Sequence, residues 1–239
     1  MARPRTRIAS ARHETRAWVT ARVTTGDADL ILTLFTESLG RVSAIAKHAL
    51  RSRRRFAGAL EPLHTLHVTL QERDGVELMT LTEARLDVVR HRIASDLGLM
   101  QAAGRALAWL KRAAPARVAE PELWARTVAL FDRLENGSTG AETAVAAWGV
   151  GLLESVGFGL ELEACVSCGA VCPEGKPARV DPARGGLVCR ACGGGSETLS
   201  AVLREALIRA RDGDLDCVPA DSASRVIELT ERTLALHVG

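Results

Sequence analysis

Two Cys-x-x-Cys pairs are the feature that most constrains how this 239-residue chain can fold. Cys165 and Cys168 form the first pair, Cys189 and Cys192 form the second, and 20 residues separate them. A glycine follows each pair directly, which lets the backbone turn sharply and brings amide protons toward the sulfurs. The spacing predicts a metal site in which two knuckles supply four thiolates to one tetrahedral ion, and it favours zinc.

Four sulfur ligands leave no coordination position open for water or substrate, so the expected Zn²⁺ is structural, with one ion per chain. The ion would organise residues 157–197, which have too few apolar side chains to fold alone. The alternatives are disulfides, a redox pair or an iron–sulfur cluster, of which the first two do not suit two matched pairs without a secretion signal. Cys172 is either a spare ligand or a loop thiol, and we favour the loop thiol. Cys217 is expected to be an inert buried residue.

Between about residues 16 and 86 the apolar residues recur at a period of two. Leu66, Val68 and Leu70 alternate with threonine and histidine, as in a half-buried strand. Five such segments predict a small closed barrel, and the long connection after the third strand fits a Greek-key barrel of the oligonucleotide-binding (OB) kind. The expected strands are Arg16–Thr25, Asp29–Thr36, Arg41–His48, Leu63–Glu72 and Val76–Ala84.

After Leu86 the apolar period becomes about 3.6, which predicts helices. The fold class is therefore α+β: a five-stranded OB barrel followed by an α-helical domain with an inserted four-cysteine zinc finger. We expect a basic extension at residues 1–15, the barrel at 16–86, and the helical domain at 87–239, including the zinc module at 157–197. Gly137 and Gly157 are expected at helix C-termini, and Ser200 and Ser222 are possible N-caps. The expected helices are Asp96–Ala113, Pro121–Glu135, Ala141–Val156, Thr198–Arg211 and Ser222–Leu236.

The net charge of +2 conceals two regions of opposite sign. Residues 1–60 carry 12 Lys and Arg against 4 acidic residues, which leaves 19 basic against 25 acidic residues in the remainder. This asymmetry makes the N-terminal region a candidate for binding a polyanion.

Residues 38–60 contain six Lys and Arg and no acidic residue. On a barrel this run would form a positive patch that follows a phosphate backbone and releases counterions when it binds. The alternative is a solvated loop whose charge only aids solubility. Phe56 is the aromatic residue expected to meet a base, whereas Trp18 and Phe35 are expected in the core. The expected nucleic-acid contacts are Arg22, Arg41, Lys47, Arg51, Arg53, Arg54, Arg55 and Phe56.

Several motifs occur in the order found in a known family. Residues 29–36, residues 40–47 with the basic run, and Leu60–Leu63 resemble the N-terminal barrel of the family of the bacterial DNA repair protein RecO. Gly157–Leu160 and the two cysteine pairs resemble that family's helical domain and zinc module. The ordered matches extend from about residue 16 to residue 238. This chain departs from the family in about fifteen additional N-terminal residues and in a shorter C-terminal tail.

The resemblance implies a recombination mediator that is cytoplasmic and associated with the nucleoid. Proteins of this family bind single- and double-stranded DNA and anneal complementary strands. With RecR they assist the loading of RecA onto DNA coated by single-stranded-DNA-binding protein. These partners and activities are expectations for this chain.

Catalytic chemistry has no support in the sequence, since no Ser/His/Asp arrangement and no phosphate-binding loop occurs. We therefore expect a protein that is not an enzyme. No apolar run approaches the about 20 residues of a membrane-spanning helix, and the basic N-terminus lacks the apolar region of a secretory signal, so we expect a soluble protein without a membrane partner. The alternative functions are a zinc-containing scaffold that acts mainly through protein–protein contacts and, from another class, a nuclease or ligase fragment.

Overall fold

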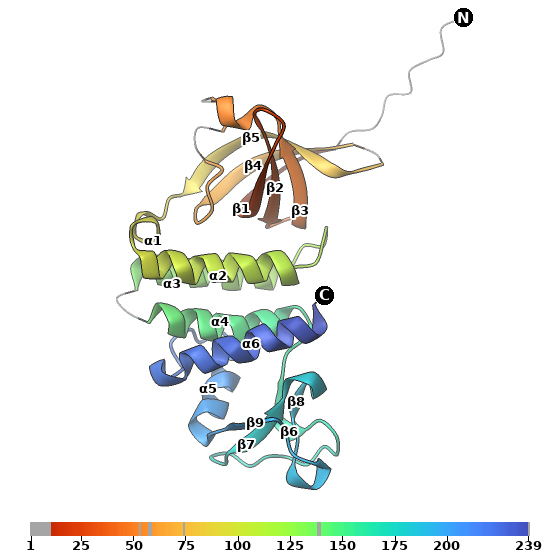
Figure 1. The fold of residues 1–239 in the computed structure, drawn as a ribbon, viewed down its shortest axis with the longest axis vertical. Helices are drawn as coiled ribbons and strands as arrows, with labels where there is room; N and C mark the ends of the chain where they lie inside the picture. Colours follow the sequence, from red (N-terminus) through yellow and green to blue (C-terminus); the bar gives the residue numbers. More distant parts are fainter. Residues whose placement is uncertain (1–10, 53, 57–58, 74, 138–139, 239) are drawn as a thin grey trace, which may run out of the picture. The chain divides into compact units, whose positions relative to one another are not determined.

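The computed structural model describes residues 11–52, 54–56, 59–73, 75–137 and 140–238 (Figure 1). The chain divides into two compact units. The first consists of the chain up to His91 together with Leu107–Glu120, and the second consists of Arg92–Ala106 and the chain from Pro121 onward. Among the described residues, no helix has both the length and the apolar character needed to cross a membrane.

A closed five-stranded barrel forms most of the first unit (Figure 1). The strand order is β1-β2-β3-β5-β4, in which β1 pairs with both β2 and β4 and β3 pairs in parallel with β5. This order confirms the predicted OB-type barrel. The strands are β1 (Arg12–Thr25), β2 (Asp29–Thr36), β3 (Gly40–Ala46), β4 (Thr65–Arg73) and β5 (Val76–Val88), and the short 3-10 turn η1 (Ala49–Arg51) follows β3.

The strand positions follow the predicted alternation, and the differences lie at strand ends. Leu66, Val68 and Leu70 of β4 are fully buried, as their period of two requires. β1 begins at Arg12, four residues before the predicted start, because its first residues pair with β4 from Gln71 backward. β4 begins two residues after the predicted position because Leu63, with a φ of 85°, has a left-handed backbone that a strand does not accept.

The predicted helices are confirmed, and each ends within a few residues of its predicted limit. Helix α4 is apolar on nearly every side and therefore lies buried, in contact with α3, α5 and α6 (Figure 1). The short helix α1 was not predicted as a separate element. The helices are α1 (His91–Ser95), α2 (Leu97–Ala113), α3 (Pro121–Asn136), α4 (Ala141–Ser155), α5 (Ala201–Arg211) and α6 (Ala223–His237).

Two of the predicted helix-end signals differ in outcome. Ser200 caps α5, since its Oγ accepts a hydrogen bond of 3.1 Å from the amide of Leu203. Ser222 occupies the predicted N-cap position of α6, but its Oγ donates to the Asp221 carboxylate and makes no cap bond to the helix. Gly157, as predicted, takes a positive φ of 82° just after α4.

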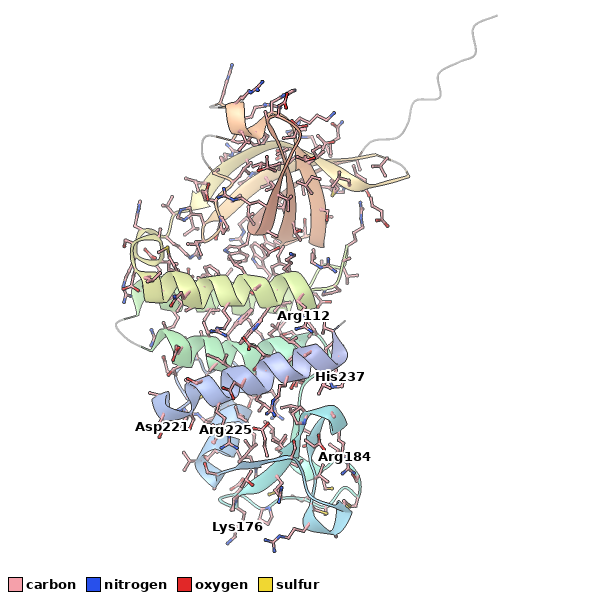
Figure 2. All side chains as sticks on the ribbon, in the orientation of Figure 1. Arg112, Lys176, Arg184, Asp221, Arg225 and His237 are labelled. Atoms are coloured by element: carbon pink, nitrogen blue, oxygen red, sulfur yellow. The ribbon has the colours of Figure 1, made fainter. Side chains whose placement is uncertain are left out.

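A small sheet lies between α4 and α5 in the chain, where no strand was predicted (Figure 1). Its strand order is β6-β8-β7-β9, and it holds the cysteine-rich segment. Helix α6 contacts this module through His237, labelled in Figure 2. The ring of His237 stacks on Phe158 with centroids 5.3 Å apart, and its Nε2 lies 3.2 Å from the carbonyl oxygen of Pro182. The strands are β6 (Glu161–Cys165), β7 (Ala178–Asp181), β8 (Gly186–Leu187) and β9 (Glu197–Leu199).

Candidate metal centre and nucleic-acid interface

The two Cys-x-x-Cys pairs meet in space. The four Sγ atoms of Cys165, Cys168, Cys189 and Cys192 all lie within 4.8 Å of one another. The Sγ atoms of Cys168 and Cys189 are 3.7 Å apart. Four sulfurs at about 2.3 Å from one tetrahedral ion would stand about 3.8 Å from each other, so the cluster has the size of a single-ion site.

Each knuckle has the backbone conformation that the glycine after it predicts. Gly169 and Gly193 have φ angles of 71° and 98°, which a residue with a side chain rarely adopts. The turn at Gly169 is closed by its amide, which donates a hydrogen bond of 2.8 Å to the carbonyl of Cys165. Cys189, at the start of the second knuckle, donates its own amide to the Cys165 sulfur at 3.3 Å.

These amide contacts and the crowding of four thiols shift the pKa values in opposite directions. Hydrogen bonds from the backbone amides of Cys189 and Ser167 stabilise the thiolate and lower the pKa of Cys165 to about 6. The neighbouring sulfurs of Cys189 and Cys168 raise the pKa of Cys192 to about 12. A divalent cation offsets the repulsion among neighbouring thiolates, which is why such a group of cysteines suits a metal ion.

Arg184, labelled in Figure 2, contacts both knuckles. Its Nη1 donates to the carbonyl of Cys192 at 3.2 Å, and its Nη2 donates to the hydroxyl of Ser167. These contacts orient backbone that carries the cysteines of the cluster, and Arg184 itself offers no ligand atom.

The two remaining cysteines lie outside the cluster. The sulfur of Cys172 accepts a hydrogen bond of 2.9 Å from Nη1 of Arg204, a buried arginine that also donates to three carbonyl oxygens of residues 172–176. Cys172 is therefore a loop thiol that helps to hold its loop on α5. Cys217 is half-buried and donates to the carbonyls of Ala206 and Asp214, and burial raises its pKa to about 11.

In the first unit, the basic residues predicted to bind nucleic acid fall into two groups. Some have no ion-pair partner among the described residues, and others already contact a carboxylate or a carbonyl oxygen. We define the basic segment as residues 47–56. Lys47, Arg51, Arg54 and Arg55 in it are exposed, and no described carboxylate pairs with them. Arg53 belongs to the same segment but lies outside the described residues.

Arg22 and Arg41 differ from this group. Arg22 forms an ion pair with Glu61, the acidic residue that closes the basic run. Arg41 is half-buried: its Nε donates to the carbonyl of Ala114 at 2.8 Å, and its backbone pairs with Pro115 and Arg117. The guanidinium of Arg41 therefore fastens β3 to the chain segment that follows α2.

The expectation that Phe56 meets a base is wrong. Its ring is only 1% exposed and belongs to the hydrophobic core of the barrel, together with Ala59 and Leu60. The residue before it is held to β5, since the carbonyl of Arg55 accepts the amide of Ala84 at 3.0 Å. The chain therefore turns the ring inward immediately after the exposed arginines. Trp18 and Phe35 are fully buried, as predicted.

The basic segment is fixed to the turn between β1 and β2. The amide of Leu50 donates to the carbonyl of Ala28 at 3.1 Å, and the amide of His48 donates to the Asp29 carboxylate at 2.7 Å. Nη2 of Arg55 donates to the carbonyl of Lys47 at 2.8 Å. Sequence reasoning overlooked His48, although it follows Lys47 directly. The run of basic residues indicated only lysines and arginines as candidate contacts. The order of the residues does not show that the imidazole of His48 is exposed.

Comparison with known proteins gives the same family for both halves of the chain. The model of the recombination protein O N-terminal domain matches residues 11–87, and that of the recombination protein O C-terminal domain matches residues 94–239. Together the two matches cover the barrel, the helices and the cysteine cluster.

Several curated proteins are similar over most of their length. The chain is 37% identical over 195 residues to the DNA repair protein RecO of Anaeromyxobacter sp. strain K, which covers 80% of this chain and 75% of that protein. It is 31% identical over 227 residues to the DNA repair protein RecO of Pelobacter propionicus, covering 94% and 91%. It is 30% identical over 233 residues to that of Myxococcus xanthus, covering 95% and 93%. The barrel, the helical unit and these matches agree, and the chain belongs to the RecO family.

Proposed function

We propose that this protein is a non-enzymatic recombination mediator that binds single- and double-stranded DNA through the basic segment of its barrel. Membership of the RecO family, together with relatives named as DNA repair proteins, supports a role in DNA repair by recombination. A protein that binds chromosomal DNA in this role acts at the nucleoid.

The observation that carries the proposal is the difference in pairing among the basic residues of the barrel. Arg12, Arg16 and Arg22 of β1 each form an ion pair with a glutamate, so much of their charge is already neutralised. Lys47 and Arg51 in the basic segment are exposed without such a partner among the described residues. Unpaired cations on a fixed backbone release counterions when they meet phosphates, which is the main source of affinity for nucleic acid.

The strand face beside this segment supports weak sequence preference. The register places Val23 of β1, Ile31 of β2 and Ile45 of β3 side by side in one row across three strands. Val23 is exposed, and the two isoleucines are half-buried. Aliphatic side chains contact bases without hydrogen-bonding their edges, so phosphate contacts would dominate binding.

Such binding suits annealing, because strands held by their backbones keep their base edges free to pair. We propose that the protein anneals complementary strands and, with RecR, assists the loading of RecA onto DNA coated by single-stranded-DNA-binding protein. The family relationship supports these partners.

We further propose that the cysteine cluster holds one structural Zn²⁺ per chain. Four sulfur donors within 4.8 Å of one another fit a zinc ion, and all four tetrahedral positions would be filled by protein. When bound, the ion would hold the two knuckles together, and no catalytic step is assigned to it.

The test compares two triple variants of the full-length protein. K47Q/R51Q/R54Q removes three cations that have no ion-pair partner among the described residues, whereas R12Q/R105Q/R209Q removes the same charge from arginines that are ion-paired in the structure. We expect only the first variant to lose affinity for labelled single- and double-stranded oligonucleotides and to anneal complementary strands more slowly. Equal losses in the two variants, or none in the first, would overturn the assignment of the basic segment.

A second candidate function, a scaffold acting through protein contacts, is favoured by one feature of the zinc module. A cavity of about 530 Å³ lies beside the cysteine cluster, lined partly by Val171, Pro173, Pro177 and Val188. Val171 is 76% exposed there and offers apolar surface at the rim of the cavity. If the wild-type protein binds no DNA but binds RecR in a pull-down with purified components, the scaffold function is supported instead.

A further inference from the structure

The Trp and Phe residues of the barrel offer no ring to a base. Trp18 and Phe35 are fully buried, and Phe56 lies in the core. Proteins that bind single strands commonly stack successive bases on exposed aromatic rings. If this barrel binds DNA, any stacking must therefore come from a side chain other than Trp or Phe.

His48 presents an exposed imidazole inside the basic segment. Its side chain is 72% exposed, which makes it far more accessible than the paired His13 on β1, at 28%. Lys47 precedes it directly, and the exposed Arg51 and Arg54 belong to the same segment. Imidazole is one of the rings on which unpaired bases stack.

The backbone of His48 is held in a conformation that it would not adopt freely. Its φ of 57° and ψ of 29° lie in the left-handed region, which is unfavourable for a residue with a Cβ atom. Hydrogen bonds on both sides maintain it: the His48 amide donates to Asp29 at 2.7 Å, and the Arg51 amide donates to the His48 carbonyl at 3.2 Å. The ring thus projects from a fixed backbone, which lowers the entropy cost of a contact with a ligand.

The charges that face His48 suit an anionic ligand with a flat base. Asp29 is the acidic neighbour, with its Oδ1 3.9 Å from the ring Nδ1, and the same oxygen accepts the His48 amide. The segment itself supplies the exposed cations Lys47, Arg51 and Arg54. Cations beside an exposed ring match the alternation of phosphate and base along a strand.

We propose that the imidazole of His48 is the ring on which one base of a bound single strand stacks, while Lys47, Arg51 and Arg54 contact the neighbouring phosphates. This inference rests on the proposed DNA binding by the barrel. The sequence indicated Phe56, which follows three arginines, as the residue that contacts a base. The proposal assigns this contact to His48 instead.

The test measures affinity for an oligo-dT strand and for an abasic strand of the same length and charge. His48→Asn removes the ring but keeps a residue that tolerates a left-handed backbone. His48→Phe keeps an aromatic ring without the imidazole nitrogens. His91→Asn is the matched control, because His91 is exposed but lies outside the basic segment.

We expect His48→Asn to weaken binding to oligo-dT by about 5- to 150-fold and to leave the affinity for the abasic strand unchanged. His48→Phe should retain the preference for bases, and His91→Asn should bind as the wild type does. Should His48→Asn fold poorly, as judged by its thermal unfolding, His48→Gly takes its place, since glycine accepts this backbone freely.

The outcomes separate this inference from the proposed function. Wild-type affinity of His48→Asn for oligo-dT would overturn the stacking role, and so would an equal loss on both strands, because the effect would then not involve a base. In both cases DNA binding itself would stand. A wild-type protein that binds neither strand would overturn the proposed function and this inference with it.

Discussion

The guanidinium of Arg55 lies over the ring of Phe56, with its Cζ 5.1 Å from the ring centroid. The ring faces the barrel core on its other sides, so the arginine covers hydrophobic surface while its Nη2 bonds to the carbonyl of Lys47. The two adjacent residues therefore have different roles. The ring of Phe56 holds the basic segment on the barrel core, and the guanidinium of Arg55 packs over that ring.

Phe56→Ala is expected to destabilise the protein through a cavity in the core. The loss in the free energy of unfolding should be about 3 to 5 kcal/mol, measured by urea denaturation. Phe56→Leu should lose less stability and should bind DNA as the wild type does under conditions where it is folded. A Phe56→Leu protein with normal stability but weakened DNA binding would contradict the buried position of the ring.

The metal site predicts a sharp division among the six cysteines. Serine at position 165, 168, 189 or 192 should abolish bound zinc, because each removes one of four ligands, whereas Cys172→Ser and Cys217→Ser should keep one zinc per chain. Metal analysis of the purified variants measures this directly. Zinc loss in Cys172→Ser, or no zinc in the wild type, would refute the ligand set.

DNA affinity should survive removal of the metal, since the basic segment belongs to the other unit.

Stability should depend on pH through Glu37. Arg16 forms two hydrogen bonds with its carboxylate, at 2.8 and 2.6 Å, and lowers the pKa of Glu37 below its usual 4.5. Because the folded state holds the charged form, this stabilisation is fully present above pH 4.5 and is lost as the pH falls through the lowered pKa.

Glu37→Gln should therefore lower the free energy of unfolding at neutral pH by less than about 1 kcal/mol, since both side chains are more than a third exposed. The deficit should vanish in strong acid, where the wild-type carboxyl is also protonated. Glu83→Gln on β5 is the control, because Glu83 is exposed and has no ion-pair partner among the described residues. Urea denaturation at neutral pH and in strong acid measures the free energy of unfolding of both variants and the wild type. An equal loss of stability in Glu37→Gln at both pH values would contradict the lowered pKa of Glu37.

Local patterns were sufficient to predict most of the fold. The alternation in residues 65–70 and the helical periodicity of α2 to α6 depend on residues that are close in the chain. Both patterns can therefore be recognised directly in the sequence. The early start of β1 at Arg12 depends on pairing with β4 about sixty residues away, which no local pattern reveals. The β6–β9 sheet was not predicted, because strands of two to five residues are too short to have a recognisable period.

The site was predicted unevenly for a similar reason. The cysteine cluster follows from spacing, because ligands three residues apart must form a knuckle. The basic run also follows from composition, but which of its cations are free depends on tertiary contacts. Arg22 is paired with Glu61 and Arg41 with the carbonyl of Ala114, and Phe56 is buried next to Arg55, whose backbone carbonyl is held to β5. These relations join residues that are distant in the chain.

We propose that the exposed cations of the basic segment bind phosphates. The most direct test is the salt dependence of affinity for oligo-dT, compared between the wild type and K47Q/R51Q/R54Q. If each residue neutralises one phosphate, the slope of log affinity against log salt should become shallower by about 2 in the variant, from about 0.7 per contact on a single strand. The R12Q/R105Q/R209Q control should keep the wild-type slope. An unchanged slope in K47Q/R51Q/R54Q would contradict the account and leave the basic segment as a solvated loop.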